Sequence, residues 1–393
     1  MSSSVGNGEK KMTYKGVVGL FRAAVVSMVV AVALVTSPLA AEKPLVFISS
    51  FATGEAGAIH AFRLDLERGA LAAVNQWTDV ENPFFLALSD DGNQLYSIHA
   101  PQFGGPDHSD VAAYAILDAN GKLELLNRQT ALGTTACYLD VSAGGRTVVV
   151  ANYGSGSVAS FPVNRDGSLK PAATFVQHQG MSVNATRQQA PHAHCFVISP
   201  DNRFVFSADL GTDQIIGYRL AGRTSELIQL ESPAATAPGA GPRHLTFHPS
   251  GKYVYVINEL LNTVSLFDYD TKTGKLTKQQ TIATLPEDFK GTSHTADLKI
   301  TPDGKFLYGT NRGHDSIACF RLSANGRLSK IAIVPSLGKG PQNLAIAGAG
   351  QLLICANMPG NNVAIFKIDS ETGSLTSVGK PVELTSPSCI MIR

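Results

Sequence analysis

A pattern of closely spaced strands recurs six times along this chain of 393 residues and limits what the chain can fold into. The copies begin at residues 82, 135, 191, 241, 293 and 340, with NPFFLALSDDGNQLYSIHA as the first and GPRHLTFHPSGKYVYVINE as the fourth. Each copy has an alternating strand, a tight turn of the PDGK kind, a second strand, a polar loop and a third strand. Most copies add an Asp/Asn-Gly turn and a short fourth strand, which predicts a four-stranded antiparallel meander.

The spacing of the copies indicates the architecture. Their turn residues lie at positions 92, 145, 202, 251, 304 and 350, so successive copies are 46 to 57 residues apart. This period is typical of a β-propeller blade. A seventh unit is present in two pieces, LVFISSFATGEAGAIHAFRLDLERGAL from Leu45 and SPSCIMIR at the C-terminus, and pairing them closes the ring without exposed edges. We therefore predict an all-β fold over residues 42–393, a seven-bladed β-propeller with four antiparallel strands per blade.

The first 41 residues differ from the repeats. Basic residues precede an apolar run of 14 residues, Ala23–Thr36, and the small residues SPLAA follow it. This arrangement is typical of a secretory signal peptide. A spanning helix needs roughly 20 apolar residues, so we expect cleavage near Ala41 and no stable membrane insertion afterwards, with an uncleaved anchor as the alternative. The mature protein is then expected in the periplasm or outside the cell.

Composition and cysteine spacing narrow the classes of partner. The chain is 44% hydrophobic and 16% charged with a formal net charge of +1, so nothing favours nucleic-acid binding. No amphipathic or coiled-coil segment suggests assembly, and we expect a monomer. The five cysteines are odd in number and lack zinc-ligand spacing, so we expect buried, small hydrophobic side chains and no required disulfide.

Three positions of the repeat hold residues that a shared structural role does not explain. Eight residues after the turn stand Ala100, Tyr153, Leu210, Glu259, Arg312 and Met358. Early in the first strand stand Phe84, Cys137, His194, Arg243, Ala296 and Gln342, and two residues earlier lie His192 and His294. Because side chains alternate along a strand and the two strands are antiparallel, these residues should converge on one mouth of the central channel. The sequence therefore predicts a binding site there.

Two further residues are candidates for contact with the substrate. His244 follows Arg243 directly. Asp209 occupies the position seven residues after the turn, which holds Asn or Asp in most copies and is expected to close the following loop. A role in turn closure is therefore the main interpretation of Asp209.

The candidate residues favour acid–base chemistry on an oxyanion. The chain has no G-x-S-x-G, P-loop, H-E-x-x-H or dinucleotide motif, and the spacing of His192 and His194 is a weak metal signal without a third ligand. We expect no metal and no cofactor. Arginines bind planar anions, and a Glu or His can move one proton. This set suits lactone hydrolysis by activated water and equally the closure of a lactone from an unsaturated acid.

The motifs PHAH, DLGTD, GAGPRHLTFHP, VINE and ITPDGKFLYGTNRGHDSI resemble the seven-bladed propeller lactonase family, which includes bacterial 6-phosphogluconolactonase and fungal carboxymuconate lactonizing enzymes. The resemblance covers Leu45 to Arg393. It implies a metal-independent site with a His, an Arg, a Glu and a second Arg. By motif these are His192, with His194 as the other candidate, Arg243, Glu259 and Arg312.

Two departures from the family pattern bear on the substrate. Sugar phosphates are kept in the cytoplasm, whereas the leader predicts export, and Gln342 stands where similar sequences often have another Arg. Both favour an unphosphorylated sugar lactone such as glucono-δ-lactone.

The leading hypothesis is therefore a lactonase acting on a small lactone substrate. In it Glu259 or His192 activates water, Arg243 and Arg312 hold the substrate, and His194 or His294 assists proton transfer. Two alternatives remain open. One is a muconate-type cycloisomerase that uses the same site, and the other is a non-catalytic propeller like the YVTN-type surface proteins, which VVVANYGSGSVASF resembles.

Overall fold

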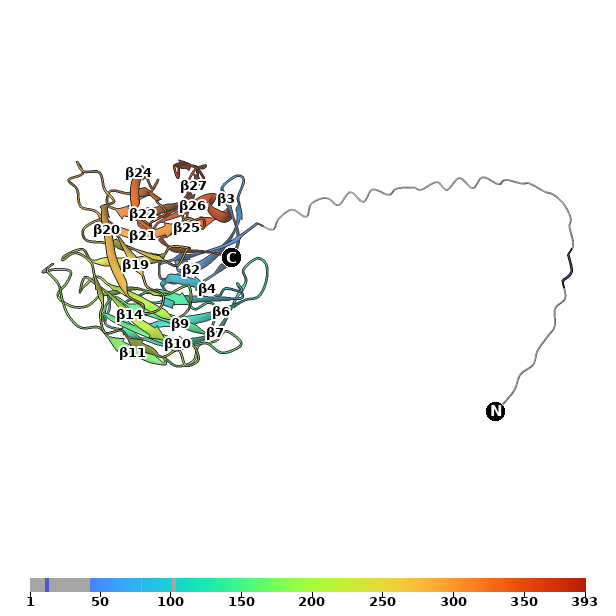
Figure 1. Ribbon diagram of the computed structural model, residues 1–393, viewed down its shortest axis with the longest axis horizontal. Helices are drawn as coiled ribbons and strands as arrows, with labels where there is room; N and C mark the ends of the chain where they lie inside the picture. Colours follow the sequence, from blue (N-terminus) through green and yellow to red (C-terminus); the bar gives the residue numbers. More distant parts are fainter. Residues whose placement is uncertain (1–10, 14–42, 79, 101–103) are drawn as a thin grey trace. The chain divides into compact units, whose positions relative to one another are not determined.

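Seven antiparallel sheets contain almost all of the regular structure (Figure 1). The computed structural model describes residues 11–13, 43–78, 80–100 and 104–393, and residues from Lys43 onward form one unit. Apart from residues 11–13, the predicted signal peptide lies outside the described residues. Among the residues that are described, no helix is long and apolar enough to cross a membrane.

The six predicted copies are six sheets. Their strands, from the innermost outward, are β4 (Pro83–Leu88), β5 (Gln94–His99), β6 (His108–Ile116) and β7 (Leu123–Thr134) in blade one; β8 (Ala136–Val141), β9 (Thr147–Asn152), β10 (Ser157–Pro162) and β11 (Thr174–Gln177) in blade two; β12 (Ala193–Ile198), β13 (Phe204–Asp209), β14 (Gln214–Leu220) and β15 (Leu227–Gln229) in blade three; β17 (Pro242–Phe247), β18 (Tyr253–Asn258), β19 (Thr263–Tyr269) and β20 (Leu276–Ala283) in blade four; β21 (His294–Ile300), β22 (Phe306–Arg312), β23 (Ser316–Leu322) and β24 (Leu328–Pro335) in blade five; and β25 (Pro341–Ala347), β26 (Leu352–Asn357), β27 (Asn362–Ile368) and β28 (Leu375–Ser377) in blade six. Two short strands add to blades three and six, β16 (Ala234–Ala235) on β14 and β29 (Val382–Glu383) on β27. Single 3-10 turns, η1 (Gly54–Ala56) and η2 (Gly348–Gly350), connect strands.

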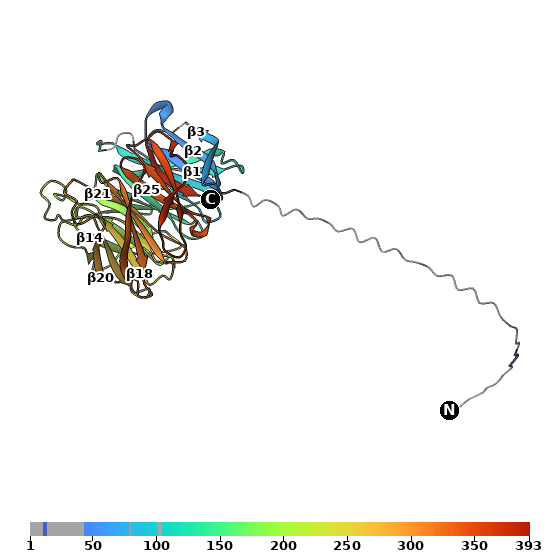
Figure 2. The same ribbon diagram turned by 90° about the horizontal axis from the view of Figure 1, so that it is seen from above.

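The seventh blade joins the two ends of the propeller. It consists of β3 (Ala70–Trp77), β2 (Ala58–Asp65), β1 (Leu45–Ser50) and the C-terminal β30 (Pro387–Ile392), and Ile48 pairs with Ile390 in the antiparallel register of β1 and β30. The blue strands β1–β3 and the red C-terminal segment accordingly lie side by side (Figures 1 and 2). The innermost strands contact one another in the order β4, β8, β12, β17, β21, β25, β30, and β30 contacts β4. The ring is closed, and the predicted fold class is confirmed.

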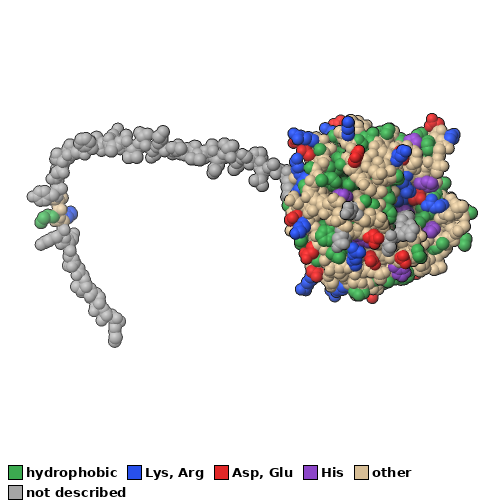
Figure 3. Space-filling view, turned by 180° about the vertical axis from the view of Figure 1, so that it is seen from behind, with side chains coloured by type: hydrophobic (Ala, Val, Ile, Leu, Met, Phe, Trp, Pro, Cys, Tyr) green, Lys and Arg blue, Asp and Glu red, His purple; other side chains and the backbone are tan. Residues whose placement is uncertain are grey.

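Apolar side chains of neighbouring blades form the core between the sheets. Tyr255 and Leu266 of blade four, for example, pack in one cluster with Leu298 and Phe320 of blade five. All five cysteines are buried and free, as predicted. Charged side chains of both signs are spread over the face shown in Figure 3, and in one region of it His side chains lie next to Lys or Arg side chains.

A repeated hydrogen bond fixes how each blade sits against the next. The hydroxyl of Tyr255 donates to the carbonyl of Gly326 at 2.6 Å, and Tyr308 donates to the carbonyl of Gly373 at 2.9 Å. The turn glycine has φ of +76° at both positions, and a Cβ on Gly373 would lie 2.2 Å from Phe306. The Asp/Asn-Gly turn is therefore required both by its backbone conformation and by the packing of the neighbouring blade.

Candidate active site

Every innermost strand contains a β-bulge near its first residues. The residues at these register shifts are Phe84 of β4, Cys137 of β8, His194 of β12, Arg243 of β17, Ala296 of β21, Gln342 of β25 and Ser388 of β30. A bulge leaves one residue without a partner on the neighbouring strand and changes the direction of its side chain. The first six are the early-strand position that the repeat comparison singled out.

These residues and a second repeat position form the walls of a cavity of about 280 Å³. The bulged residues Phe84, His194, Arg243 and Gln342 line it, together with Tyr153, Glu259, Arg312 and Met358, which all stand eight residues after a turn. Phe51 and Arg187 complete the lining. Two repeat positions predicted from the sequence therefore meet in one cavity.

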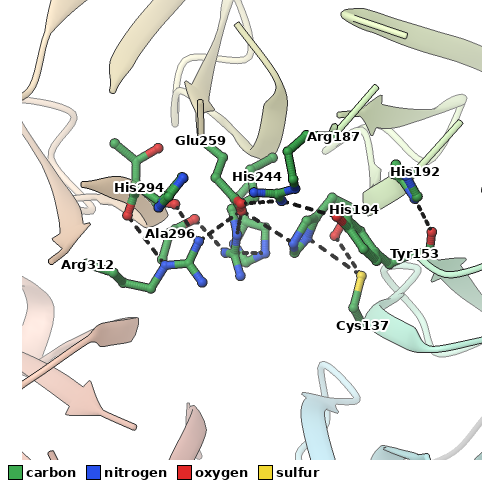
Figure 4. A network of polar contacts seen from close by, with 12 residues as sticks. Cys137, Tyr153, Arg187, His192, His194, His244, Glu259, His294, Ala296 and Arg312 are labelled. Carbon is green, nitrogen blue, oxygen red and sulfur yellow. Dashed lines mark hydrogen bonds and ion pairs between the residues drawn. The ribbon is translucent and has the colours of Figure 1, made fainter. Parts of the chain in front are cut away.

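Three arginines surround the carboxylate of Glu259 (Figure 4). Arg243 Nε donates to Oε2 at 3.0 Å, and Arg312 Nη2 lies 2.9 Å from the same oxygen. Arg187 Nη2 donates to Oε1 at 2.7 Å. The side chain of Glu259 is only 6% exposed, so these ion pairs are screened little by water. The cavity carries an excess of positive charge, because three guanidinium groups face one carboxylate.

Arg243 is the most enclosed of the three arginines. Its side chain is 2% exposed, whereas those of Arg312 and Arg187 are 27% and 34% exposed. Arg243 Nη1 donates to the carbonyl of Ala296 at 2.7 Å. Its Nη2 atom has no hydrogen-bond partner among the described residues and belongs to a side chain that lines the cavity. Arg243 can therefore donate to an oxygen bound in the cavity.

The charges around Glu259 control its ionisation. Burial raises the pKa of this carboxyl, but Arg312, Arg243, His194 and Arg187 outweigh burial and hold the pKa well below its usual range. Burial and the charge of Arg312 lower the pKa of Arg243 to about 10, so both groups are charged near neutral pH. Glu259 is consequently a weak base that attracts cations and orients donors.

His194 faces Glu259 from the bulge in β12. Its Nε2 atom lies 3.9 Å from Oε2 of Glu259, and its Nδ1 atom lies 3.6 Å from Sγ of Cys137. The Cys137 thiol contacts the carbonyl of His194 at 3.2 Å, and burial raises the pKa of this thiol so that it keeps its proton. Burial and the charge of Arg243 lower the pKa of His194 well below its ordinary value. His194 is therefore a neutral imidazole with one nitrogen available to the cavity.

His192 and His294 lie beside the cavity and do not line it. His192 Nδ1 is 2.9 Å from the carbonyl of Tyr153, and its ring stacks on that of Tyr153 at 4.6 Å. Figure 4 shows His192 farther from Glu259 than His194. The alternation that placed His192 and His194 on one face fails because the bulge lies at His194. Burial lowers the pKa of His294, whose backbone carbonyl accepts from Arg312 Nε at 3.4 Å.

Asp209 and His244 also lie outside the cavity lining. Asp209 Oδ1 accepts from the backbone N–H groups of His192, Gly211 and Thr212 at 2.9 to 3.1 Å, which is the predicted turn closure. Its Oδ2 lies 2.6 Å from Nδ1 of the buried His178. The structure therefore places Asp209 in the scaffold and away from any bound substrate. His244 lies behind Arg243 and contacts Nη1 of that residue at 3.1 Å.

Arg187 is the cavity residue that the repeat comparison missed. It lies in the loop between β11 and β12, outside the repeated strands, and its Nη2 also donates to the hydroxyl of Tyr153 at 3.2 Å. The largest interval between turn residues, from 145 to 202, contains this loop and was a usable signal of an inserted functional segment.

A larger hollow of about 640 Å³ lies at the opposite ends of the innermost strands. Turn residues such as Ser89 and Gly145 line it together with exposed side chains such as Arg146 and Arg223. It contains no buried, mutually bonded set of acid, base and cation like that around Glu259. In the part of the chain that is described, no group of three or more His, Cys, Asp or Glu side chains is placed to hold a metal ion.

Comparison with known proteins identifies the family. The family model described as "Lactonase, 7-bladed beta-propeller" matches residues 45–392. The chain belongs to this family. It is 34% identical to the 6-phosphogluconolactonase of Bacillus subtilis over 346 residues, which cover 88% of this chain and 97% of that protein.

Solved structures agree with this assignment. A Bacteroides fragilis protein crystallised as a candidate 6-phosphogluconolactonase has a TM-score of 0.83 and 33% identity, with 91% of this chain and 99% of that chain covered. The periplasmic gluconolactonase of Pseudomonas aeruginosa also has a TM-score of 0.83, with 29% identity and coverage of 89% and 98%. This propeller lactonase therefore resembles proteins named for a phosphorylated and for an unphosphorylated substrate.

Proposed function

We propose that this protein hydrolyses a sugar lactone to the aldonic acid at the cavity around Glu259. The observation that carries the proposal is a buried carboxylate held by three arginines and faced by a neutral imidazole, His194, at 3.9 Å. This set provides a base, an anion that stabilises the protonated base, and donors for an oxyanion. The similarity to lactonases supports the reaction class.

His194 is the base in the proposed reaction. Its Nδ1–H donates to Sγ of Cys137, and the thiol donates to the carbonyl of His194, so the lone pair of Nε2 faces the cavity. A water roughly 2.8 Å from both Nε2 of His194 and Oε2 of Glu259 would be hydrogen-bonded to both groups. Glu259 orients this water, because its own pKa is held too low for it to take the proton.

Proton and electron transfers balance within the site. The water gives its proton to Nε2 of His194 as its oxygen attacks the lactone carbonyl carbon, and the carbonyl oxygen becomes an oxyanion. Nη2 of Arg243 and Nη1 of Arg312 are the cavity groups that can donate to this oxygen. The tetrahedral intermediate then breaks the bond from the carbonyl carbon to the ring oxygen. His194 returns its proton to that leaving oxygen, and the aldonic acid is released.

An unphosphorylated lactone of an exported enzyme is the proposed substrate. The signal-peptide pattern of residues 1–41 supports export, and the similarity to a periplasmic gluconolactonase supports a lactone without phosphate. Gln342, an uncharged residue, occupies one wall of the cavity where a fourth arginine would favour phosphate. We further propose that the enzyme is a monomer and acts without a metal, since the reaction above needs only the side chains of this chain.

The test is the rate of acid release from glucono-δ-lactone by the purified mature domain in the presence of a chelator, above the spontaneous rate. A matched assay uses the 6-phosphorylated lactone. We expect a chelator-resistant rate with a larger kcat/KM for the unphosphorylated substrate. A larger value for the phosphorylated lactone would overturn the substrate proposal but not the reaction class. No rate on either lactone, with turnover of a muconate, would replace lactonase by cycloisomerase.

A further inference from the structure

A second ring of side chains lies directly behind the bulged residues. The residues that follow the bulges are Phe85, Tyr138, Cys195, His244, Asp297, Asn343 and Cys389. Four of the seven positions hold an aromatic residue or a cysteine. The three others, in the adjacent blades four, five and six, hold a histidine, an aspartate and an asparagine. The exceptions to the ring are therefore contiguous in space.

These three residues are joined in one hydrogen-bonded chain that begins at Arg243. Arg243 Nη1 lies 3.1 Å from Nε2 of His244, and Nδ1 of His244 lies 2.9 Å from Oδ1 of Asp297. Asn343 Nδ2 donates to Oδ2 of Asp297 at 2.8 Å. Asn343 Oδ1 accepts from the backbone N–H of Ile390 at 2.8 Å, which ties the chain to the closing blade.

Hydrogen-bond polarity assigns the tautomer of His244. A guanidinium nitrogen can only donate, so Nε2 of His244 must accept from Arg243. The proton of the neutral ring then lies on Nδ1 and is donated to Asp297. Asp297 also receives hydrogen bonds from Lys299 Nζ at 2.9 and 3.1 Å and from the backbone N–H of Leu344 at 2.9 Å. Every described contact to the Asp297 carboxylate is a donor, so the aspartate can act only as an acceptor.

Such a chain is costly in a propeller core. His244, Asp297 and Asn343 are 1 to 3% exposed, and groups of this kind lose their hydration when they are buried. The same ring is filled by apolar side chains in blades one, two, three and seven, so packing does not require polar residues. The chain ends at the one fully buried arginine of the candidate active site. A role that concerns the direction of Arg243 explains why the polar residues occur in these blades.

We propose that Asp297 and His244 are positioning residues that fix the guanidinium of Arg243, so that its Nη2 points into the cavity to bind the lactone oxyanion and the aldonate product. This inference rests on the proposed lactonase function. Glu259 holds Nε of the guanidinium, His244 and the carbonyl of Ala296 hold Nη1, and Nη2 is left for the ligand. Such preorganisation avoids reorganisation cost during the reaction.

The proposed arrangement predicts an acid limit. Protonated His244 would present an Nε2–H to Arg243 Nη1, and two donors would face each other. The charged or titratable groups that face His244 are Arg243 on its own strand, Asp297 and Lys299 on β21, His194 on β12 and Tyr138 on β8. Burial and the charge of Arg243 lower the pKa of His244 to about 4, so the neutral tautomer is maintained at ordinary pH.

The test compares two substitutions of His244. Gln in H244Q can accept from Arg243 through its oxygen and donate to Asp297 through its nitrogen, whereas Met in H244M can do neither. We expect H244M to lose roughly 100-fold in kcat, the effect of one misplaced oxyanion donor, with a smaller change in KM. H244Q should retain kcat within about threefold and lose the acid limit assigned to His244. Cys389→Ala, in the same ring but outside the chain, is the control and should behave as the wild type.

A second measurement is independent of turnover. Imidazole ¹⁵N shifts in the full mature domain should show His244 with a protonated Nδ1 and an unprotonated Nε2, and D297N should abolish this state or prevent folding. Gluconate, the product, should bind H244M more weakly than the wild type in calorimetry. A wild-type protein without lactonase activity would sink the proposed function, yet the tautomer and gluconate binding would still decide the positioning role. An Nε2–H tautomer, or H244M with unchanged kcat and gluconate affinity, would overturn it.

Discussion

Replacement of Glu259 by Gln tests the charge balance of the cavity most directly. The substitution keeps the shape of the side chain and removes the one negative charge that faces Arg187, Arg243 and Arg312. The protein then has three guanidinium groups around a neutral amide. Both stability and activity should fall, for separate physical reasons.

The stability cost follows from how well each arginine can recover water. Removing one partner of a buried ion pair costs about 3–5 kcal/mol. Arg187 and Arg312 are 34% and 27% exposed and can be rehydrated, whereas Arg243 is 2% exposed and cannot. We therefore expect about 3 kcal/mol, the low end of that range. At roughly 2 °C per kcal/mol for a large domain, Tm should fall by roughly 6 °C.

The activity loss follows from the loss of the group that orients the water and stabilises protonated His194. We expect kcat/KM to fall by at least roughly 100-fold, measured at a temperature where both proteins are folded. Circular dichroism melting gives Tm for the same samples. Glu124→Gln, at an exposed glutamate on β7, is the control and should change stability by less than about 0.5 kcal/mol. A fully active E259Q variant would refute the assigned role of Glu259, and an unchanged Tm would refute the charge argument.

Three further outcomes follow from the same geometry. His194→Gln should lower kcat by roughly 100-fold or more while leaving the melting curve close to that of the wild type; if kcat is retained, another group is the base. Arg187→Met should raise KM and cost less than about 1 kcal/mol of stability, because Arg187 is partly exposed and Arg243 and Arg312 still hold Glu259; an unchanged KM would remove Arg187 from the binding site. Burial first, and then the nearby Arg128 and Arg243 respectively, lower the pKa values of His99 and His244 to about 4. The folded state therefore binds fewer protons than the unfolded state below pH 6.5, so these two residues make stability decrease as pH falls from about 6.5 to about 4. Urea titrations across this window should show a smaller decrease for H244Q than for the wild type, and equal slopes would contradict the assignment.

The fold could be predicted from the sequence because a propeller repeats a short local pattern. Each copy carries its own strand alternation and turn residues, and the closing of the ring followed from the complementary pieces at Leu45 and at the C-terminus. The same repetition identified Glu259, Arg243, Arg312 and His194 as exceptions, since a residue needed by every blade recurs and a residue needed by the site does not. The role of Asp209 in turn closure followed from the same comparison.

The direction of individual side chains could not be predicted in this way. Strand alternation treats His192 and His194 as equivalent, but a bulge, which depends on pairing with the neighbouring strand, turns His194 into the cavity and leaves His192 against Tyr153. Arg187 reaches Glu259 from a loop that has no counterpart in the repeat. The chain from Arg243 through His244 to Asp297 joins residues of different blades, and such contacts depend on how the blades pack around the axis. A repeated sequence thus encodes the blade, while the ionisation and orientation of the site arise from contacts between blades.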